Sequence, residues 1–164
     1  MVPSANHQLS EGKTMSAIAN ITVYDGAATP VAHTLSAISV TRENGVTEAL
    51  YREAISSLPT EAQVNATIRE KVLSSGVKQV ELRVNVPVME SVAGNNAAGY
   101  TAAPKVAYVD SFVFTNYQHP RSTITSRRLA RMLAVNIANN VGTSVAAATS
   151  GPAPEAFDSQ VLPT

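Results

Sequence analysis

The most regular alternation of apolar and polar residues in the chain lies between Ala66 and Glu90. Its second half alternates Val80, Leu82, Val84 and Val86 with Gln79, Glu81, Arg83 and Asn85. Its first half places Ile68 and Val72 out of phase with Thr67, Arg69 and Lys71. Successive side chains of a strand point to opposite faces, and Ser74-Ser75-Gly76 between the halves is typical of a turn. The stretch therefore predicts a β-hairpin with one apolar face for a core and one polar face, which meets either solvent or a polar partner.

Similar patterns predict strands on both sides of this hairpin, at residues 18–24, 31–40 and 106–115. The first two flank Asp25-Gly26, a turn dipeptide, and so predict a second hairpin. The third is rich in β-branched and aromatic residues, which favour strands. Glu43-Asn44-Gly45 predicts a further turn, and residues 46–55 after it fit either a strand or a short helix.

The spacing of the apolar residues becomes helical after His119-Pro120. Within residues 123–140 the apolar positions are Leu129, Met132, Leu133 and Ile137, whereas Arg127, Arg128 and Arg131 lie largely on other faces. Gly142 follows, and glycine is favoured just past the end of a helix. This pattern predicts one amphipathic helix of about 18 residues.

Three segments lack such a pattern. Residues 1–16 are polar and aperiodic, and predict a flexible N-terminal extension, or equally a start-site artefact. Residues 91–103, rich in Ala, Gly and Asn, predict a mobile loop. Residues 143–164, rich in Ala, Ser, Thr and Pro, predict a C-terminal arm outside the core. The compact domain is therefore expected to span residues 17–142.

The order of these elements predicts an α+β fold, with an N-terminal β-hairpin and an antiparallel β-sheet followed by a C-terminal helix. One helix is too narrow to cover the apolar face of about six or seven strands. A second copy of the chain would supply the missing cover, so we expect an interlocked homodimer in which each helix lies across the sheet of its partner. The helix residues expected at this dimer interface are Leu129, Met132, Leu133 and Ile137.

Composition sets limits on partners. The 164 residues, 45% of them hydrophobic, suit one globular domain. Twelve basic and twelve acidic side chains cancel, so any nucleic-acid site has to arise from a local arrangement of charge. The chain has no cysteine, which excludes disulfides and thiolate chemistry. It has no apolar run of about 18 residues and no secretory signal, so we expect no membrane partner.

The same residues argue against an enzyme. His7, His33 and His119 do not have the spacing of metal ligands. The sequence contains no Gly-rich phosphate loop and no nucleophile elbow. We therefore expect no catalytic residues, no metal site and no cofactor.

Four stretches between about Asn20 and Asn140 are informative together: ITVYDG with its return strand, VELRVNVPVME, KVAYVDSFVFT, and RSTITSRRLARMLAVNIANN. In their order and spacing the chain resembles the coat proteins of leviviruses, the small single-stranded RNA bacteriophages. It implies a homodimer whose C-terminal helices interlock with the partner. It further implies that dimers assemble in the cytoplasm of the bacterial host into an icosahedral capsid, the shell of the virion, with the sheets facing single-stranded viral RNA inside.

The resemblance also implies RNA-binding residues on the polar faces of the strands, namely Thr67, Arg69, Lys71, Glu81, Arg83, Asn85, Tyr108 and Asp110. Arg and Lys neutralise phosphates, and a tyrosine ring stacks on a base. Glu81 and Asp110 depart from this pattern, because an acidic group does not help to bind phosphate. Phe112 and Phe114 share the face of Tyr108, which fits a partly buried face instead. The alternative function is a non-capsid dimeric module that binds single-stranded nucleic acid or represses translation.

Overall fold

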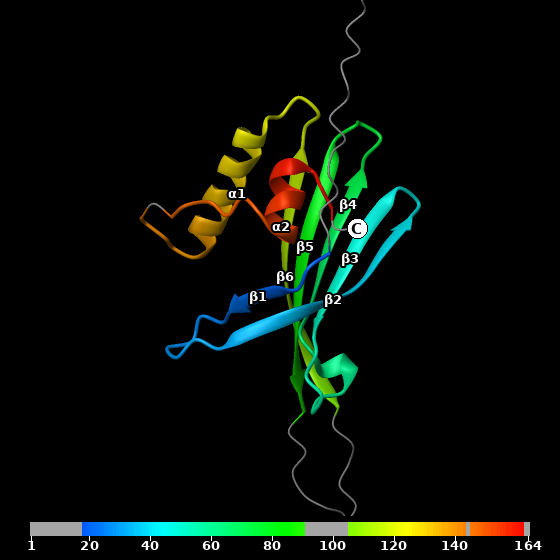
Figure 1. The fold of residues 1–164 in the computed structure, drawn as a ribbon, viewed down its shortest axis with the longest axis vertical. Helices are drawn as coiled ribbons and strands as arrows, with labels where there is room; N and C mark the ends of the chain where they lie inside the picture. The colour runs from blue at the N-terminus through cyan, green and yellow to red at the C-terminus, as the bar shows by residue number, and fades with distance from the viewer. Residues whose placement is uncertain (1–17, 91–104, 144, 163–164) are drawn as a thin grey trace, which may run out of the picture.

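The structure is a computed structural model that describes residues 18–90, 105–143 and 145–162. Its strands are β1 (Ile21–Tyr24), β2 (Ala32–Glu43), β3 (Val46–Glu53), β4 (Asn65–Val72), β5 (Lys78–Met89) and β6 (Val106–Gln118). They form one antiparallel sheet in sequence order, which confirms the predicted succession of hairpins (Figure 1). The helical elements are η1 (Thr60–Ala62), α1 (Ile124–Ala138), α2 (Pro152–Pro154) and the π-helical turn η2 (Glu155–Ser159). The expected extension, residues 1–16, and the expected loop, residues 91–103, lie outside the described residues.

The turn between β2 and β3 decides the structure of residues 46–55, which the sequence pattern left open. Asn44 and Gly45 have φ angles of 51° and 74°, in the left-handed region that a two-residue hairpin turn of type I′ requires. The turn pairs Glu43 with Val46 and returns the chain directly along β2. Residues 46–53 therefore form a strand, which pairs with β2 on one side and β4 on the other.

The register of the central hairpin confirms its predicted alternation. Ile68 lies opposite Leu82, and Arg69 lies opposite Glu81; residues directly opposed in an antiparallel pair share a face. The buried residues of the apolar face are Leu35, Ala49, Tyr51, Ala66, Ile68 and Val80. Burial raises the pKa of Tyr51 to about 12, so this hydroxyl stays neutral.

The C-terminal residues belong to this core, which corrects the expectation of an arm outside it. Ala156 is completely buried and Phe157 is 6% exposed, and both pack with the residues of the apolar sheet face. Gln118, at the end of β6, donates from Nε2 to the backbone oxygens of Ala156 at 3.4 Å and Phe157 at 2.8 Å. Composition concealed this role because the segment has few large apolar side chains, so its short helical turn has no amphipathic period.

Helix α1 lies beside the sheet, and the element that it chiefly contacts is η2 (Figure 1). Thr123 caps the first turn of α1, since its side chain accepts a hydrogen bond from the Ser126 N–H at 3.2 Å. Among the described residues, no helix is both long enough and apolar enough to cross a membrane.

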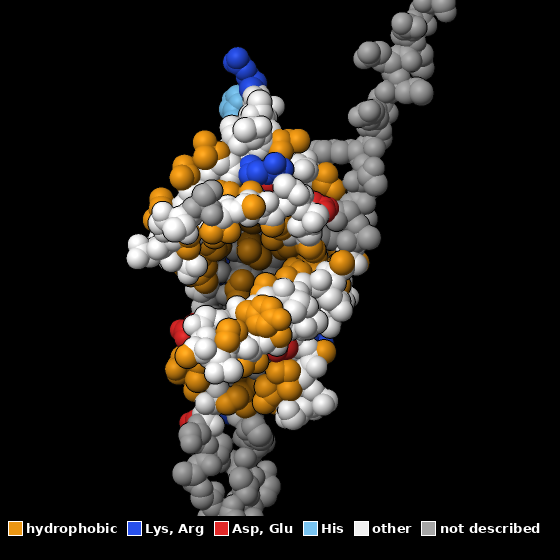
Figure 2. Space-filling model, turned by 60° about the vertical axis from the view of Figure 1, so that its left-hand side comes forward, with side chains coloured by type: hydrophobic (Ala, Val, Ile, Leu, Met, Phe, Trp, Pro, Cys, Tyr) orange, Lys and Arg blue, Asp and Glu red, His pale blue; other side chains and the backbone are white. Residues whose placement is uncertain are grey.

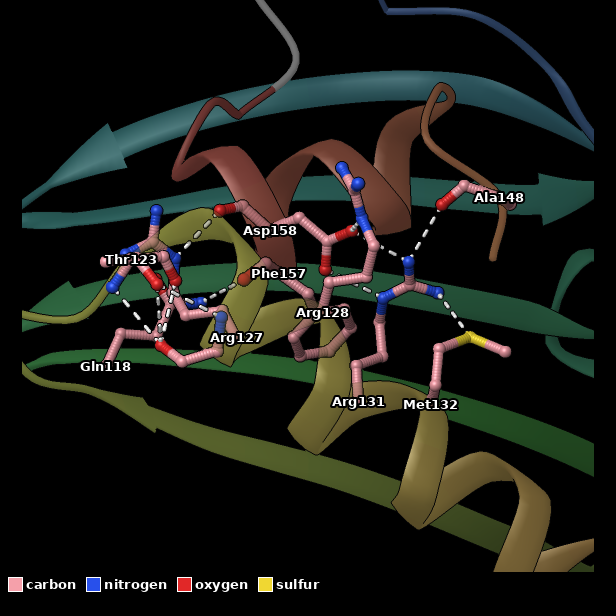
Figure 3. Close-up of polar contacts among 10 residues, drawn as sticks. Gln118, Thr123, Arg127, Arg128, Arg131, Met132, Ala148, Phe157 and Asp158 are labelled. Carbon is pink, nitrogen blue, oxygen red and sulfur yellow. Dashed lines mark hydrogen bonds and ion pairs between the residues drawn. The ribbon is translucent and has the colours of Figure 1, made fainter. Parts of the chain in front are cut away.

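We call α2 and η2 together the C-terminal turn. Three arginines of α1 bind this turn through one residue, Asp158 (Figure 3). Asp158 is 1% exposed, and its carboxylate accepts from Arg128 Nε at 3.0 Å and from Arg131 Nε and Nη2 at 2.9 and 2.8 Å. Arg127 Nε donates to the backbone oxygen of Asp158 at 2.7 Å. We call these four residues the Asp158 latch. Charged hydrogen bonds are stronger than neutral ones, so the latch ties α1 firmly to the sheet-bound C-terminal turn.

Replacing Phe157 by Ala is expected to lower the free energy of unfolding by about 3–5 kcal/mol, because it removes a buried ring and leaves a cavity over the sheet. Urea denaturation at a fixed protein concentration measures the change. Val72→Ala is the control, since Val72 is 53% exposed, and this change should cost less than about 1 kcal/mol. A Phe157→Ala variant as stable as the parent would show that the C-terminal turn is not part of the core.

The latch also predicts a dependence of stability on pH. Burial raises the pKa of Asp158, but hydrogen bonds and charge from Arg131 and Arg128 outweigh it, so the pKa lies below the ordinary value of 3.8. A carboxylate with a depressed folded pKa contributes stability above its unfolded pKa and loses that contribution as the pH falls through its folded pKa.

We therefore expect Asp158→Asn to be less stable than the parent at pH 7, and the difference to shrink as the pH falls below 3.8. Denaturant midpoints of both proteins between neutral and acid pH measure this convergence. A difference that stays constant into acid would mean that the Asp158 charge does not contribute to stability.

Candidate nucleic-acid and subunit interfaces

The structure brings six of the eight expected RNA-binding residues to one polar sheet face, namely Thr67, Arg69, Lys71, Glu81, Arg83 and Asn85. In the register of β4 and β5, Thr67 lies opposite Arg83 and Lys71 lies opposite Gln79. Arg69, Lys71 and Arg83 are exposed, whereas the other three are partly exposed. The polar face thus presents three cationic side chains on two neighbouring strands.

Tyr108 and Asp110 lie on the opposite face, which corrects their expected position beside these cations. β6 pairs Tyr108 with Val88 and Asp110 with Val86, so both side chains share the apolar face of β5. Phe112 and Phe114 lie on that face too, with ring centroids 4.9 Å apart in an edge-to-face contact. Phe114 packs against the core, as expected for a face that is partly buried.

The sequence reasoning missed the residues of β6 that do share the polar face. Tyr117 lies opposite Gln79, which in turn lies opposite Lys71, and it is 64% exposed. The same register brings Ser111 to the polar face, where its Oγ donates to Asn85 Oδ1 at 2.7 Å. No local signal could have found them, because the parity of β6 relative to β5 is fixed only by pairing between strands.

Acidic side chains offset part of the positive charge on the polar face. Arg83 Nη2 lies 3.4 Å from Glu81 Oε1, and Arg69 Nε lies 3.9 Å from Glu48 Oε2. Exposed ion pairs of this kind contribute at most about 1 kcal/mol, so a phosphate can compete for the arginines. Beside them lies a small polar hollow of about 100 Å³, lined by Arg69, Lys71, Gln79 and Glu81.

The second surface is the apolar side of α1. Of the residues expected at a dimer interface, Leu129 is 60% exposed, Leu133 is 53% exposed and Ile137 is 79% exposed. Met132 is partly buried, with its sulfur 3.8 Å from Arg131 Nη1. An isolated protomer therefore leaves a row of large apolar side chains in water, which marks an interaction surface.

A groove of about 550 Å³ separates α1 from the sheet, and its apolar lining includes Leu82, Phe114, Ala134, Val135 and Phe157. Figure 2 shows hydrophobic side chains gathered around a hollow on this side of the molecule. Strand β6 lies beside the groove and is the last strand of the sheet, so its outer edge pairs with no strand of the described residues. A long unpaired edge is a template for pairing with another chain.

The ionisable cluster around His33 has a structural place in the fold. His33 Nδ1 lies 3.0 Å from Glu53 Oε1, and His33 Nε2 lies 3.8 Å from Asp25 Oδ2. Asp25 Oδ1 accepts from the Val31 N–H at 2.9 Å, which is the largest cause of the lowered pKa of Asp25 and closes the loop between β1 and β2. Within residues 18–90, 105–143 and 145–162, no three His, Asp or Glu side chains are placed to hold a metal ion.

Solved structures of phage particles share this fold. A chain of the virus-like particle of bacteriophage EMS014 is 26% identical with a TM-score of 0.66, and the match covers 90% of this chain and 99% of that chain. A chain of the virus-like particle of bacteriophage ESE058 is 17% identical with a TM-score of 0.65, and the match covers 88% of this chain and 97% of that chain. A chain of the virus-like particle of Beihai levi-like virus 21 is 22% identical with a TM-score of 0.59, and the match covers 76% of this chain and 87% of that chain. No curated protein sequence matches the chain significantly.

The family model described as levivirus coat protein matches residues 16–153. This range takes in the whole described sheet, α1 and the start of the C-terminal segment. The chain therefore belongs to the levivirus coat protein family and is a capsid protein of an RNA bacteriophage.

Proposed function

We propose that this capsid protein forms an interlocked homodimer and that the dimers assemble into an icosahedral shell around single-stranded viral RNA, in the cytoplasm of the bacterial host. The observation that carries the proposal is the open edge of β6 next to an apolar groove and the exposed apolar side of α1. Residues of β6 line one wall of the groove and residues of α1 line another, and a second copy of the chain would satisfy all three features together.

In this dimer, the β6 strands of two protomers pair antiparallel across a two-fold axis and join two sheets into one. Because α1 stands beside its own sheet, this pairing would carry each helix over the sheet of the partner. Leu129, Leu133 and Ile137 would then cover the exposed apolar residues Val86 and Phe112. The contact would bury apolar area on both sides, which is the main driving force for association.

The polar face, on the other side of the joined sheet, is the proposed RNA surface. Arg69, Lys71 and Arg83 contribute three cations per protomer, and two-fold symmetry doubles them. Phosphate contacts act through counterion release, so binding should weaken steeply with salt. Glu48 and Glu81 lie beside the arginines and favour weak, sequence-tolerant contacts, which suits packaging of a long RNA.

The decisive experiment measures the particle size of the purified recombinant protein by size-exclusion chromatography and electron microscopy. A megadalton particle that contains RNA supports the capsid proposal. Two chains of 17.2 kDa would instead elute at about 34 kDa, and a dimer that binds nucleic acid without forming particles would contradict the proposed shell.

Leu133→Asp is expected to prevent dimers and particles, because it places an unpaired charge in the proposed interface at a cost of several kcal/mol. Thr125→Asp is the matched control on the same helix: Thr125 is exposed, and an acidic residue in the first turn suits the helix dipole. Electron microscopy and sedimentation of both variants provide the comparison. Particles formed by Leu133→Asp would rule out interlocked helices.

Changing Arg69, Lys71 and Arg83 together to Ser should lower the RNA content of particles and leave dimers intact, because none of the three side chains lies on the apolar face. The ratio of absorbance at 260 and 280 nm measures RNA content. The opposite change, Glu48→Gln with Glu81→Gln, frees Arg69 and Arg83 from their acidic neighbours and should raise the salt concentration at which RNA is released. Unaltered RNA content in the triple variant would assign packaging to another surface.

A further inference from the structure

Helix α1 has two functional sides, and the Asp158 latch occupies one of them. The latch arginines Arg127, Arg128 and Arg131 span just over one turn of the helix on this side. With 3.6 residues per turn, Leu129 and Leu133 project from the opposite side, and both are exposed. The helix is thus fixed to its own chain by polar contacts while its apolar side remains free.

The latch connects α1 to the sheet through a short rigid path. Phe157 is packed in the core and its backbone oxygen accepts from Gln118 at the end of β6. Asp158 follows directly, and its carboxylate and backbone oxygen receive the three arginines (Figure 3). Arg131 Nη2 adds a hydrogen bond to the backbone oxygen of Ala148 at 2.8 Å. Every link lies within one protomer.

We propose that the Asp158 latch presets the angle of α1, so that Asp158 is a positioning residue for capture of a second copy of this chain. The inference rests on the dimer proposed above. Ordering a docking element before it meets its partner lowers the entropy cost of association. Without the latch, α1 keeps its apolar side but has few contacts to its own sheet. Each encounter with a second protomer then has to fix the orientation of α1, at a cost in entropy.

The test compares Asp158→Asn with Glu155→Gln in the same turn. Glu155 Oε1 accepts from the Gly151 N–H at 3.0 Å, and the glutamine oxygen keeps that acceptor. Sedimentation velocity over a dilution series, below concentrations that form particles, gives the dimer dissociation constant. We expect Asp158→Asn to raise it about tenfold or more and Glu155→Gln to leave it within about twofold. Hydrogen exchange should quicken in α1 and stay unchanged in β4 and β5.

The outcomes separate the two proposals. A parent protein that stays monomeric refutes the proposed dimer, and with it the role of the latch. A parent that dimerises, with a folded Asp158→Asn variant of equal affinity, refutes the latch alone, because a merely stabilising contact would lower the unfolding midpoint without changing the affinity of folded protein. If Asp158→Asn is insoluble, Arg128→Gln provides the same measurement, since the Arg128 side chain is 34% exposed and Arg131 still holds the carboxylate.

Discussion

Covering the apolar face of the sheet is the constraint on which the rest of the structure depends. The chain covers the centre of this face itself, by folding Ala156 and Phe157 back onto strands β3 to β5. It leaves uncovered the part nearest β6, where Phe112 is 57% exposed and Val86 is 43% exposed. In the proposed dimer, folding and association would therefore use one hydrophobic surface, of which Ala156 and Phe157 cover the part that belongs to the protomer's own core.

On the polar face, by contrast, the positive charges of the arginines are nearly balanced by nearby glutamates. The two arginines of β4 and β5 each have a glutamate close by, whereas Lys71 has no acidic group within ion-pair distance among the described residues. In the proposed RNA surface, such a face would attract phosphates without holding them tightly. Over the proposed shell, moderate attraction on many identical subunits would add up, so the proposal does not require strong binding by any one protomer.

The periods of apolar residues along the chain correctly predicted the features that depend on neighbouring residues alone, namely the faces of single strands and the extent of the helix. The alternation in residues 66–90 specified both faces of β4 and β5, and the helical spacing located α1 to within two residues at each end. Tyr108 and Asp110 were misplaced because the face of a strand depends on its pairing, which no period within β6 reveals. The core role of Phe157 and the latch escaped prediction because they join groups 27 to 39 residues apart in a segment without periodicity.

The two-residue turn at Asn44 and Gly45 has a consequence for how such a chain can change in length. One residue inserted there, unless the turn took it up as a three-residue loop, would shift β3 against β2, and a shift of one residue exchanges the two faces of a strand. Ala49 and Tyr51 would then point outward and Glu48 inward. A change of length that moved this register would therefore disrupt the core, and connections that do not set a register are the places where the fold tolerates it.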